Sequence, residues 1–89
     1  MLNARLSNIL SELMTADSPL TSAYLANGLN VTSRTIRSDI KELDHLLSKN
    51  GASITSIRGA GYRLSIQNDH LFRQFLQNTF QEEISHPVF

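Results

Sequence analysis

The stretch that most constrains the fold of this chain is residues 32–49, TSRTIRSDIKELDHLLSK. Four aliphatic side chains recur in it on a helical period of about 3.6 residues, which predicts one long helix with a single buried stripe. They are Ile36, Ile40, Leu43 and Leu47. Thr32 is suited to be the N-cap, because its hydroxyl can accept a hydrogen bond from an unpaired backbone N–H. Gly51 is expected to stop the helix.

The opposite face of this predicted helix gives the first indication of function. Its first turns present two arginines and several hydroxyls, a combination that suits the major groove of DNA. Arginine can pair bidentately with guanine N7 and O6, whereas lysine is better suited to phosphate. The residues expected to contact DNA here are Ser33, Arg34, Thr35, Arg37, Ser38 and Lys41. On the helix alone, a solvated polar face explains the charges as well, and local capping explains Thr35 almost as well.

Two shorter helices are predicted before it. An apolar face over residues 2–14 predicts a first helix that ends near Ala16. Thr21 is the expected N-cap of a second helix over residues 22–29. Asn30 falls between the second and third helices, and asparagine tolerates the positive φ that such a tight turn commonly requires. A short helix, a tight turn and a longer helix with a basic face together predict a helix-turn-helix.

After the third helix the hydrophobic period changes to that of a strand. Apolar and polar residues alternate over 62–66, which predicts a half-buried strand. Its inward side chains are expected to be Tyr62, Leu64 and Ile66. The predicted partner is residues 53–57, rich in β-branched side chains, and residues 58–61 form the hairpin loop. A hairpin in this position is a wing.

Two wing arginines are further candidates for DNA contact. Arg58, at the tip, is expected to reach a neighbouring minor groove or a phosphate, and Arg63 a phosphate. The alternative is an exposed loop arginine that contacts nothing.

Length and composition exclude several other classes of protein. With 89 residues, the chain has room for one compact domain and a tail, in which an enzyme cleft is not expected. Cysteine is absent, and His45, His70 and His86 are too far apart in sequence to suggest a metal site. No arrangement of catalytic residues stands out, so we expect neither enzymatic activity nor a cofactor. The N-terminus predicts neither a signal peptide nor a membrane span, so the chain is expected to be cytoplasmic.

The net charge of zero is the strongest argument against DNA binding, because DNA-binding modules are usually basic. The charge is, however, unevenly distributed. Residues 31–63 contain six basic and three acidic side chains, an excess of +3. We expect this polarity to orient the domain on double-stranded DNA, with weak binding by an isolated copy because phosphate contacts supply most non-specific affinity.

A fourth helix is predicted over residues 69–83, with apolar side chains over a wide arc. A terminal helix on so small a domain needs less apolar surface, so a second copy of the chain is expected to cover part of it. The residues expected at this homodimer contact are Leu71, Phe72, Phe75 and Phe80. An alternative remains open, in which this helix is the working surface of a protein-interaction module and the basic helix is not.

The predicted fold is thus mainly α with a small β-hairpin, a winged helix-turn-helix with a three-helix core, a wing and an extra C-terminal helix. We assign residues 1–67 to the winged helix-turn-helix domain. Residues 68–89 are assigned to a C-terminal helix that serves as a linker or dimerisation segment and leads to further domains.

Two motifs resemble those of a known family. They are LANGLNVTSRTIRSDIKEL at residues 25–43 and RGAGYRL at residues 58–64. In combination they resemble the N-terminal winged helix-turn-helix of bacterial sugar-operon transcription activators, of the mannitol and lichenan regulator type. The chain departs from the family pattern at Asn30, where the turn residue is usually glycine, and at Thr32, where the N-cap is usually serine.

The resemblance implies a winged helix-turn-helix that binds DNA and regulates genes of carbohydrate uptake or utilisation. It also implies dimerisation and histidine phosphorylation by the phosphotransferase system, both in downstream domains. The N-terminal domain of biotin-operon repressors, attached to a biotin ligase, shares the winged layout but lacks the RTIRxDI match, and it ranks second. The sequence leaves the operator, the sugar and the choice between activation and repression open.

Overall fold

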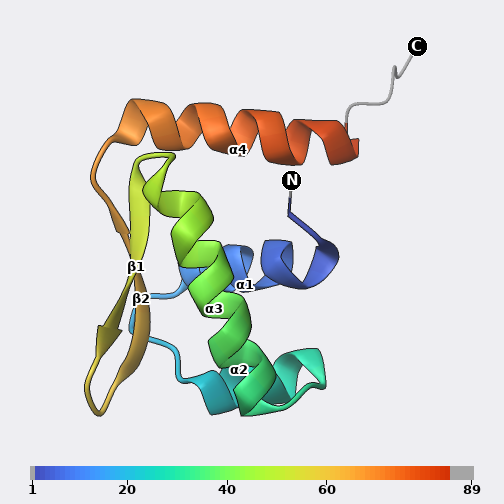
Figure 1. The fold of residues 1–89 in the computed structure, drawn as a ribbon, viewed down its shortest axis with the longest axis vertical. Helices are drawn as coiled ribbons and strands as arrows, with labels where there is room; N and C mark the ends of the chain where they lie inside the picture. Colours follow the sequence, from blue (N-terminus) through green and yellow to red (C-terminus); the bar gives the residue numbers. More distant parts are fainter. Residues whose placement is uncertain (1, 85–89) are drawn as a thin grey trace.

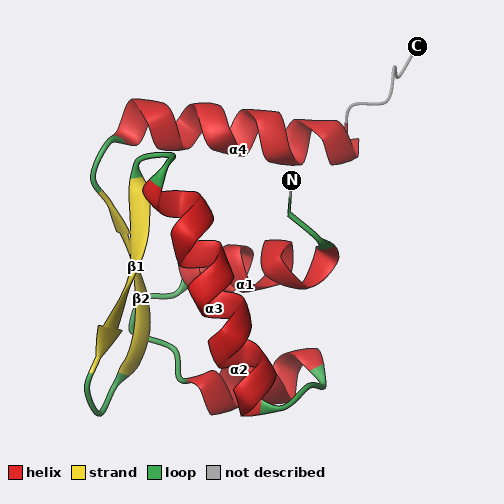
Figure 2. Cartoon of the chain, viewed as in Figure 1, coloured by secondary structure: helices red, strands yellow, loops and turns green. Residues whose placement is uncertain are grey.

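The computed structural model describes residues 2–84, and the side chains of residues 2–79. It consists of helices α1 Ala4–Thr15, α2 Ser22–Leu29 and α3 Ser33–Ser48, strands β1 Ala52–Ile57 and β2 Gly61–Ile66, and helix α4 Asp69–Ile84. Three helices pack together with the hairpin along one side, and α4 lies across one end of this assembly (Figure 1). The predicted fold class, mainly α with one β-hairpin, is confirmed (Figure 2).

Side-chain caps fix where the first three helices begin. The side chain of Asn3 accepts a hydrogen bond from the backbone N–H of Leu6 at 2.8 Å. Thr21 caps α2 through the backbone N–H of Tyr24 at 3.0 Å. Thr32 caps α3 in the same way, through the backbone N–H of Thr35. Each cap satisfies a backbone donor that the helix itself leaves unpaired. The caps predicted at Thr21 and Thr32 are confirmed.

The turn between α2 and α3 depends on one residue in the left-handed conformation. Asn30 has φ 60° and ψ 44°, and it is the one non-glycine residue with positive φ in the described chain. Its backbone N–H and that of Val31 both donate to the carbonyl of Ala26. The predicted tight turn is confirmed, and it brings α2 against α3.

The core lies between α1, α2 and α3, and is closed by the start of β1 and one residue of α4. The buried apolar residues are Leu6, Ile9, Leu10, Leu13, Leu25, Ala26, Ile36, Ile40, Leu43, Leu47, Ala52 and Phe72. All four residues of the predicted stripe on α3 belong to this core. Burying one aliphatic side chain of this size contributes roughly 1.5–3 kcal/mol, so the stripe alone holds α3 firmly.

The hairpin is attached to the helices by a third extended segment. Strands β1 and β2 pair antiparallel, from Ala52 opposite Ile66 to Ile57 opposite Gly61. Leu20, in the link between α1 and α2, forms an antiparallel bridge with Tyr62 of β2. The Leu20 N–H donates to the Tyr62 carbonyl at 2.9 Å, and the Tyr62 N–H donates to the Leu20 carbonyl at 2.7 Å. This bridge fixes the start of β2.

One of the three side chains predicted to point inward from β2 does not. Tyr62 and Leu64 are half-buried, but Ile66 is 48% exposed. Ile66 is the last residue of its strand, and the following backbone already turns toward α4 through hydrogen bonds from Gln67 and Asn68 to the carbonyl of Gly51. The inward positions of Tyr62 and Leu64 are confirmed, but the predicted alternation ends there, because Ser65 is half-buried and Ile66 lies beyond the core.

Helix α4 uses its first two turns to pack on the domain. Phe72 is 2% exposed and belongs to the core, while Phe75 and Leu76 are half-buried against it. The rings of Phe72 and Phe75 stack with their centroids 6.3 Å apart. The prediction that Phe72 contacts a second copy is wrong, because its side chain is already covered within the same chain. Leu71 is 42% exposed.

Some predictions on the C-terminal segment are not tested. The side chain of Phe80, and His86 with the rest of residues 85–89, lie outside the described part of the chain. The boundary at residue 67 stays a prediction.

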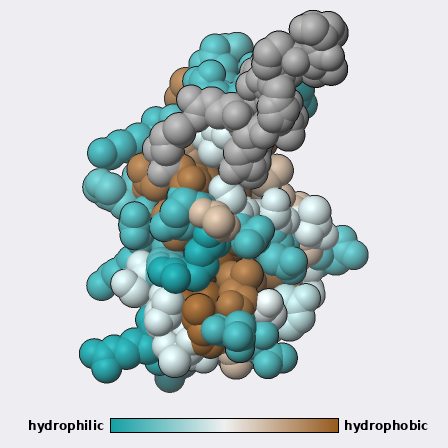
Figure 3. All heavy atoms as spheres, turned by 90° about the vertical axis from the view of Figure 1, so that its right-hand side faces the viewer, coloured by the Kyte–Doolittle hydropathy of each residue, from teal (hydrophilic) through white to brown (hydrophobic). Residues whose placement is uncertain are grey.

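The surface of the described residues has both apolar and hydrophilic regions. Figure 3, which shows one side of the molecule, has apolar surface along its middle with hydrophilic residues on both sides. The large apolar side chains that are exposed come from four elements, and they are Met14, Tyr24, Ile66 and Leu71. Within residues 2–84, no helix has the length and apolar character needed to cross a membrane.

Candidate nucleic-acid interface

The exposed face of α3 carries the strongest concentration of the predicted DNA contacts. Arg34, Arg37, Ser38 and Lys41 are all exposed. Their spacing is i, i+3, i+4 and i+7, which places them on one face of a helix. The core residues of α3 occupy the opposite face. The structure therefore brings together three cations and one hydroxyl on the outer surface of the second helix of the helix-turn-helix.

Two other predicted residues lie at the beginning of the same helix and are less accessible. Ser33 and Thr35 are half-buried. Thr35 takes part in the N-cap: its backbone N–H donates to the Thr32 hydroxyl at 3.1 Å, and the Thr32 hydroxyl donates to the Thr35 hydroxyl at 3.0 Å. The capping explanation for Thr35 is thus observed. The Thr35 oxygen can still accept a second hydrogen bond, so its contact with DNA stays a prediction.

An open groove runs between the exposed face of α3 and the hairpin. Arg37, Ser38, Ile40 and Lys41 line it from α3, and Tyr62 lines it from β2. Tyr62 was predicted only as an inward-pointing residue of a strand. The structure shows that it also faces the polar surface of α3. One sequence signal could have indicated this position. Tyrosine combines an apolar ring with a polar hydroxyl, and Tyr62 stands at the start of the strand that returns from the wing tip.

The two wing arginines are exposed but lie apart from this groove. Arg58 occupies the turn between β1 and β2, and Arg63 follows Tyr62 on β2, opposite Thr55. Successive side chains of a strand point to opposite faces, so Arg63 lies on the face of the hairpin away from Tyr62. The structure does not bring either arginine to the cations of α3, and their contacts with DNA stay predictions.

An ion pair between the exposed Arg5 and the buried Asp39 fixes α3 relative to α1. The Arg5 guanidinium makes two hydrogen bonds to Asp39, from Nε to Oδ2 and from Nη2 to Oδ1, the second at 3.1 Å. Asp39 is 6% exposed. From the sequence, Asp39 lies near the edge of the buried stripe and faces away from the basic face, which predicts a structural residue that pairs with a nearby donor; the pair with Arg5 confirms this. The negative charge of Asp39 is thus turned inward and paired.

The same pair has a clear effect on Arg5. Its pKa is raised, first by the hydrogen bond to Asp39 and then by the negative charge of that carboxylate. A group whose folded pKa is raised stabilises the fold fully at all pH values below its unfolded pKa, and loses that effect only as the pH rises through the folded pKa. For an arginine this window lies in strong alkali, so the charge on Arg5 is constant wherever DNA binding is measured.

A second carboxylate of α3 joins the helix to the wing. Oδ1 of Asp44 accepts a hydrogen bond from the backbone N–H of Ile54 in β1 at 2.7 Å. A hydrogen bond to a charged acceptor is stronger than one between neutral groups. Asp39 and Asp44 therefore attach α3 to α1 and to β1, respectively, which fixes its exposed face relative to the hairpin.

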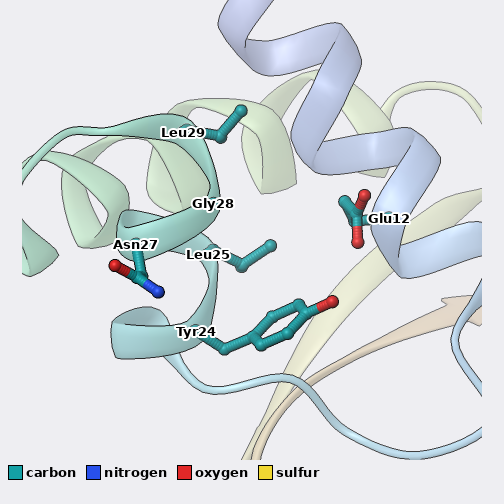
Figure 4. A pocket seen from close by; sticks show the side chains of 6 residues that line it. All are labelled: Glu12, Tyr24, Leu25, Asn27, Gly28 and Leu29. Atoms are coloured by element: carbon teal, nitrogen blue, oxygen red, sulfur yellow. The ribbon is translucent and has the colours of Figure 1, made fainter.

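A separate small pocket lies between α1 and α2. Figure 4 shows its lining residues, Glu12, Tyr24, Leu25, Asn27, Gly28 and Leu29. The Tyr24 ring points from α2 toward the helix that carries Glu12 (Figure 4). This pocket includes none of the residues predicted to contact DNA. Within the described residues no group of three or more His, Asp or Glu side chains could hold a metal ion.

Comparisons with known proteins agree with this geometry. A family model described as "HTH domain" matches residues 5–63. The chain is also 50% identical, over 88 residues, to a protein of Bacillus subtilis (strain 168) named "Probable licABCH operon regulator". That match covers 99% of this chain but 14% of the relative, so the chain spans a small part of the relative's length.

A solved structure supports the fold. The crystal structure of ScpB from Mycobacterium tuberculosis is similar with a TM-score of 0.66 and 14% sequence identity, over 100% of this chain and 56% of that one. At this identity the likeness concerns the fold alone. The family model spans α1, the helix-turn-helix and the hairpin as far as Arg63, and the resemblance to the N-terminal domain of sugar-operon regulators is confirmed. The chain belongs to the HTH-domain family of helix-turn-helix proteins.

Proposed function

We propose that this chain is the sequence-specific DNA-binding domain of a bacterial transcription regulator, with genes of carbohydrate uptake or utilisation as its targets. The observation that carries the proposal is the exposed face of α3, where Arg34, Arg37, Ser38 and Lys41 lie together. A helix with such a face can enter the major groove, with arginines reading base edges and lysine positioned for phosphate. A DNA-binding role places the chain in the cytoplasm, where the bacterial chromosome lies.

The targets are proposed from the relative. A probable regulator of the licABCH operon shares half of its aligned residues with this chain over nearly its whole length. The phosphotransferase-dependent regulation that the resemblance implies belongs, in this proposal, to other domains of a longer protein. A biotin-ligase-like protein is less well supported, because the relative is named as an operon regulator.

The paired Asp39 answers the objection from net charge. The chain is neutral overall, and on α3 Asp39 is buried and paired with Arg5, whereas Glu42 is exposed beside Lys41. Electrostatic attraction to phosphate depends on the charges that face the DNA, and on the exposed face of α3 the three cations outnumber the single carboxylate of Glu42. The neutral total is then consistent with modest affinity rather than with absence of binding.

The roles of Arg34 and Lys41 can be separated experimentally. We expect Arg34→Ala to relax base preference at one position of the site, and Lys41→Ala to weaken binding to all duplexes alike. If four phosphates are neutralised, the slope of log affinity against log salt is about −3.6 for the unchanged protein, and Lys41→Ala makes it shallower by about 0.9. The measurement is selection of duplexes from a random pool, followed by fluorescence anisotropy at several salt concentrations.

Two outcomes would contradict this division. If Arg34→Ala and Lys41→Ala lose the same binding affinity on every duplex, Arg34 does not read bases. A slope near zero for the unchanged protein would mean that phosphates are not neutralised, and would count against DNA binding itself. Both variants replace exposed side chains, so thermal melting should show that the fold is kept.

A homodimer remains part of the proposal, with a smaller contact than the sequence indicated. Phe72 is used within the chain, but Leu71 at the start of α4 is 42% exposed and Phe75 is only half-buried. Helix-turn-helix proteins commonly bind two half-sites as dimers, which would double the number of phosphate contacts. Analytical ultracentrifugation of the chain tests this directly, and a single species of monomer mass at all concentrations and on DNA would rule it out.

The alternative of a protein-interaction module that works through α4 is weakened by the same observation. Its support was the wide apolar arc of this helix. Part of that arc now has an intramolecular explanation, since Phe72 completes the core and Phe75 stacks on it.

A further inference from the structure

The groove between α3 and the hairpin contains one residue whose role in the proposed function has not been assigned. Tyr62 lies across from Arg37, Ser38 and Lys41 and lines the same groove. Both of its backbone hydrogen-bonding groups are already used in the bridge to Leu20. The part of Tyr62 that faces the groove is therefore its side chain.

The phenol hydroxyl of Tyr62 is available to hydrogen-bond to a ligand in this groove. Among the described side chains it has no hydrogen-bond partner, although Thr55 and Ser65 on the same hairpin pair with each other. A phenol hydroxyl is a good hydrogen-bond donor to an anionic oxygen. Its neighbours across the groove are two cations and a hydroxyl, a set that favours an anion over a neutral group or a cation.

The position of the groove indicates which anion it is. One wall is the helix face proposed to read the major groove, and the other is the hairpin whose tip is proposed to reach the neighbouring minor groove. The sugar-phosphate backbone of one DNA strand separates these two grooves of a duplex. A phosphate of that strand therefore has to pass between α3 and β2 when both are engaged.

We infer that Tyr62 is a phosphate-binding residue of the DNA interface, whose hydroxyl donates to a phosphate oxygen of the strand between α3 and the wing. The inference rests on the proposed DNA-binding function and deepens it. The bridge to Leu20 and the half-buried ring hold the phenol in place before DNA arrives. Little conformational entropy is then lost when the contact forms.

The test compares Tyr62→Phe with the unchanged protein on a selected duplex. The change removes one oxygen and keeps the ring and the bridge to Leu20, so the fold should be unaffected. We expect affinity to fall roughly tenfold on all duplexes alike, as for loss of one hydrogen bond to a charged group. The salt slope should stay the same, because no charge is removed. Tyr24→Phe, which removes an exposed phenol at the α1–α2 pocket, is the matched control and should bind as the unchanged protein does.

A second measurement identifies the partner atom. Neutral methylphosphonate linkages are placed one at a time along the duplex. At one position the substitution should weaken the unchanged protein but have little further effect on Tyr62→Phe. This loss of additivity is the signature of a direct contact.

The outcomes separate the inference from the function on which it rests. If Tyr62→Phe binds with unchanged affinity while Lys41→Ala still weakens binding, the inference is overturned and the DNA-binding function stands. The inference is also overturned if Tyr62→Phe and Tyr24→Phe lose the same DNA-binding affinity. It is likewise overturned if the effect of Tyr62→Phe on affinity is additive with that of a methylphosphonate at every position. If the unchanged protein binds no duplex, the proposed function itself fails.

Discussion

Replacing Gly61 by alanine should detach the wing from the rest of the domain. Gly61 has φ +124°, and a Cβ built there lies 2.4 Å from the carbonyl oxygen of Leu20 and 2.8 Å from the nitrogen of Thr21. These are backbone atoms, which cannot move aside as the end of a flexible side chain can. The Leu20–Tyr62 bridge, adjacent to this contact, is therefore expected to break.

The expected cost of Gly61→Ala is about 3 kcal/mol or more, from backbone strain and from the lost hydrogen bonds of the bridge. Urea denaturation measures the free energy of unfolding. Amide hydrogen exchange should show that Leu20 and Tyr62 lose protection, while the core residues of α3 keep theirs. DNA binding should weaken as well, because the bridge positions Tyr62 in the groove.

Gly59→Ala is the matched control on the same hairpin. Gly59 also has positive φ, +80°, but nothing lies within 4 Å of a Cβ built there. Its replacement should cost about 1 kcal/mol, from backbone strain alone. If the two variants are equally stable and the amides of Leu20 and Tyr62 remain protected in both, close approach of Leu20 is not what requires glycine at position 61.

Truncating the centre of the stripe on α3 should have a similarly large effect. Leu43 is completely buried in the core between the helices. Leu43→Ala should lower the free energy of unfolding by about 2–5 kcal/mol, through lost apolar burial and the cavity left behind. Since small domains are stable by only about 5–15 kcal/mol, a large share of the total is lost. Chemical denaturation provides the measurement.

Leu46→Ala tests whether this loss comes from the core. Leu46 belongs to the same helix but is only half-buried at the edge of the core. The same chemical change there should cost about 1 kcal/mol, because a partly exposed side chain loses less burial and leaves no closed cavity. Alanine has a higher helix propensity than leucine, so propensity cannot explain a loss at either position. A loss at Leu46 as large as that at Leu43 would contradict the claim that depth of burial in the core decides the cost.

The features that could be predicted from the sequence are those decided by a few neighbouring residues. The caps at Thr21 and Thr32 use donors three residues away, and the left-handed Asn30 follows from the shortness of its turn. The stripe and the polar face of α3 follow from helical periodicity alone. The exposure of Arg34 and Lys41 was therefore predictable, although exposure does not establish what they contact.

The remaining features depend on segments that are far apart in the chain. That Asp39 needed a partner could be predicted, but that the partner is Arg5, 34 residues earlier, required the packing of α1 on α3. The burial of Phe72 and the exposure of Ile66 depend on where α4 crosses the end of the domain. Tyr62 was predicted to face inward, and only the arrangement of hairpin and helix shows that it lines the groove.

The central claim is that the polar face of α3 enters the major groove of duplex DNA. The most direct test is equilibrium binding to a selected duplex in which each purine of the site is replaced by its 7-deaza analogue. This replacement removes the N7 acceptor of the major groove and keeps base pairing and the minor groove intact. We predict a loss of roughly tenfold or more at one or two purines, and no such loss for Arg34→Ala at the base that Arg34 reads. Undiminished affinity on a duplex without any purine N7 would contradict the claim.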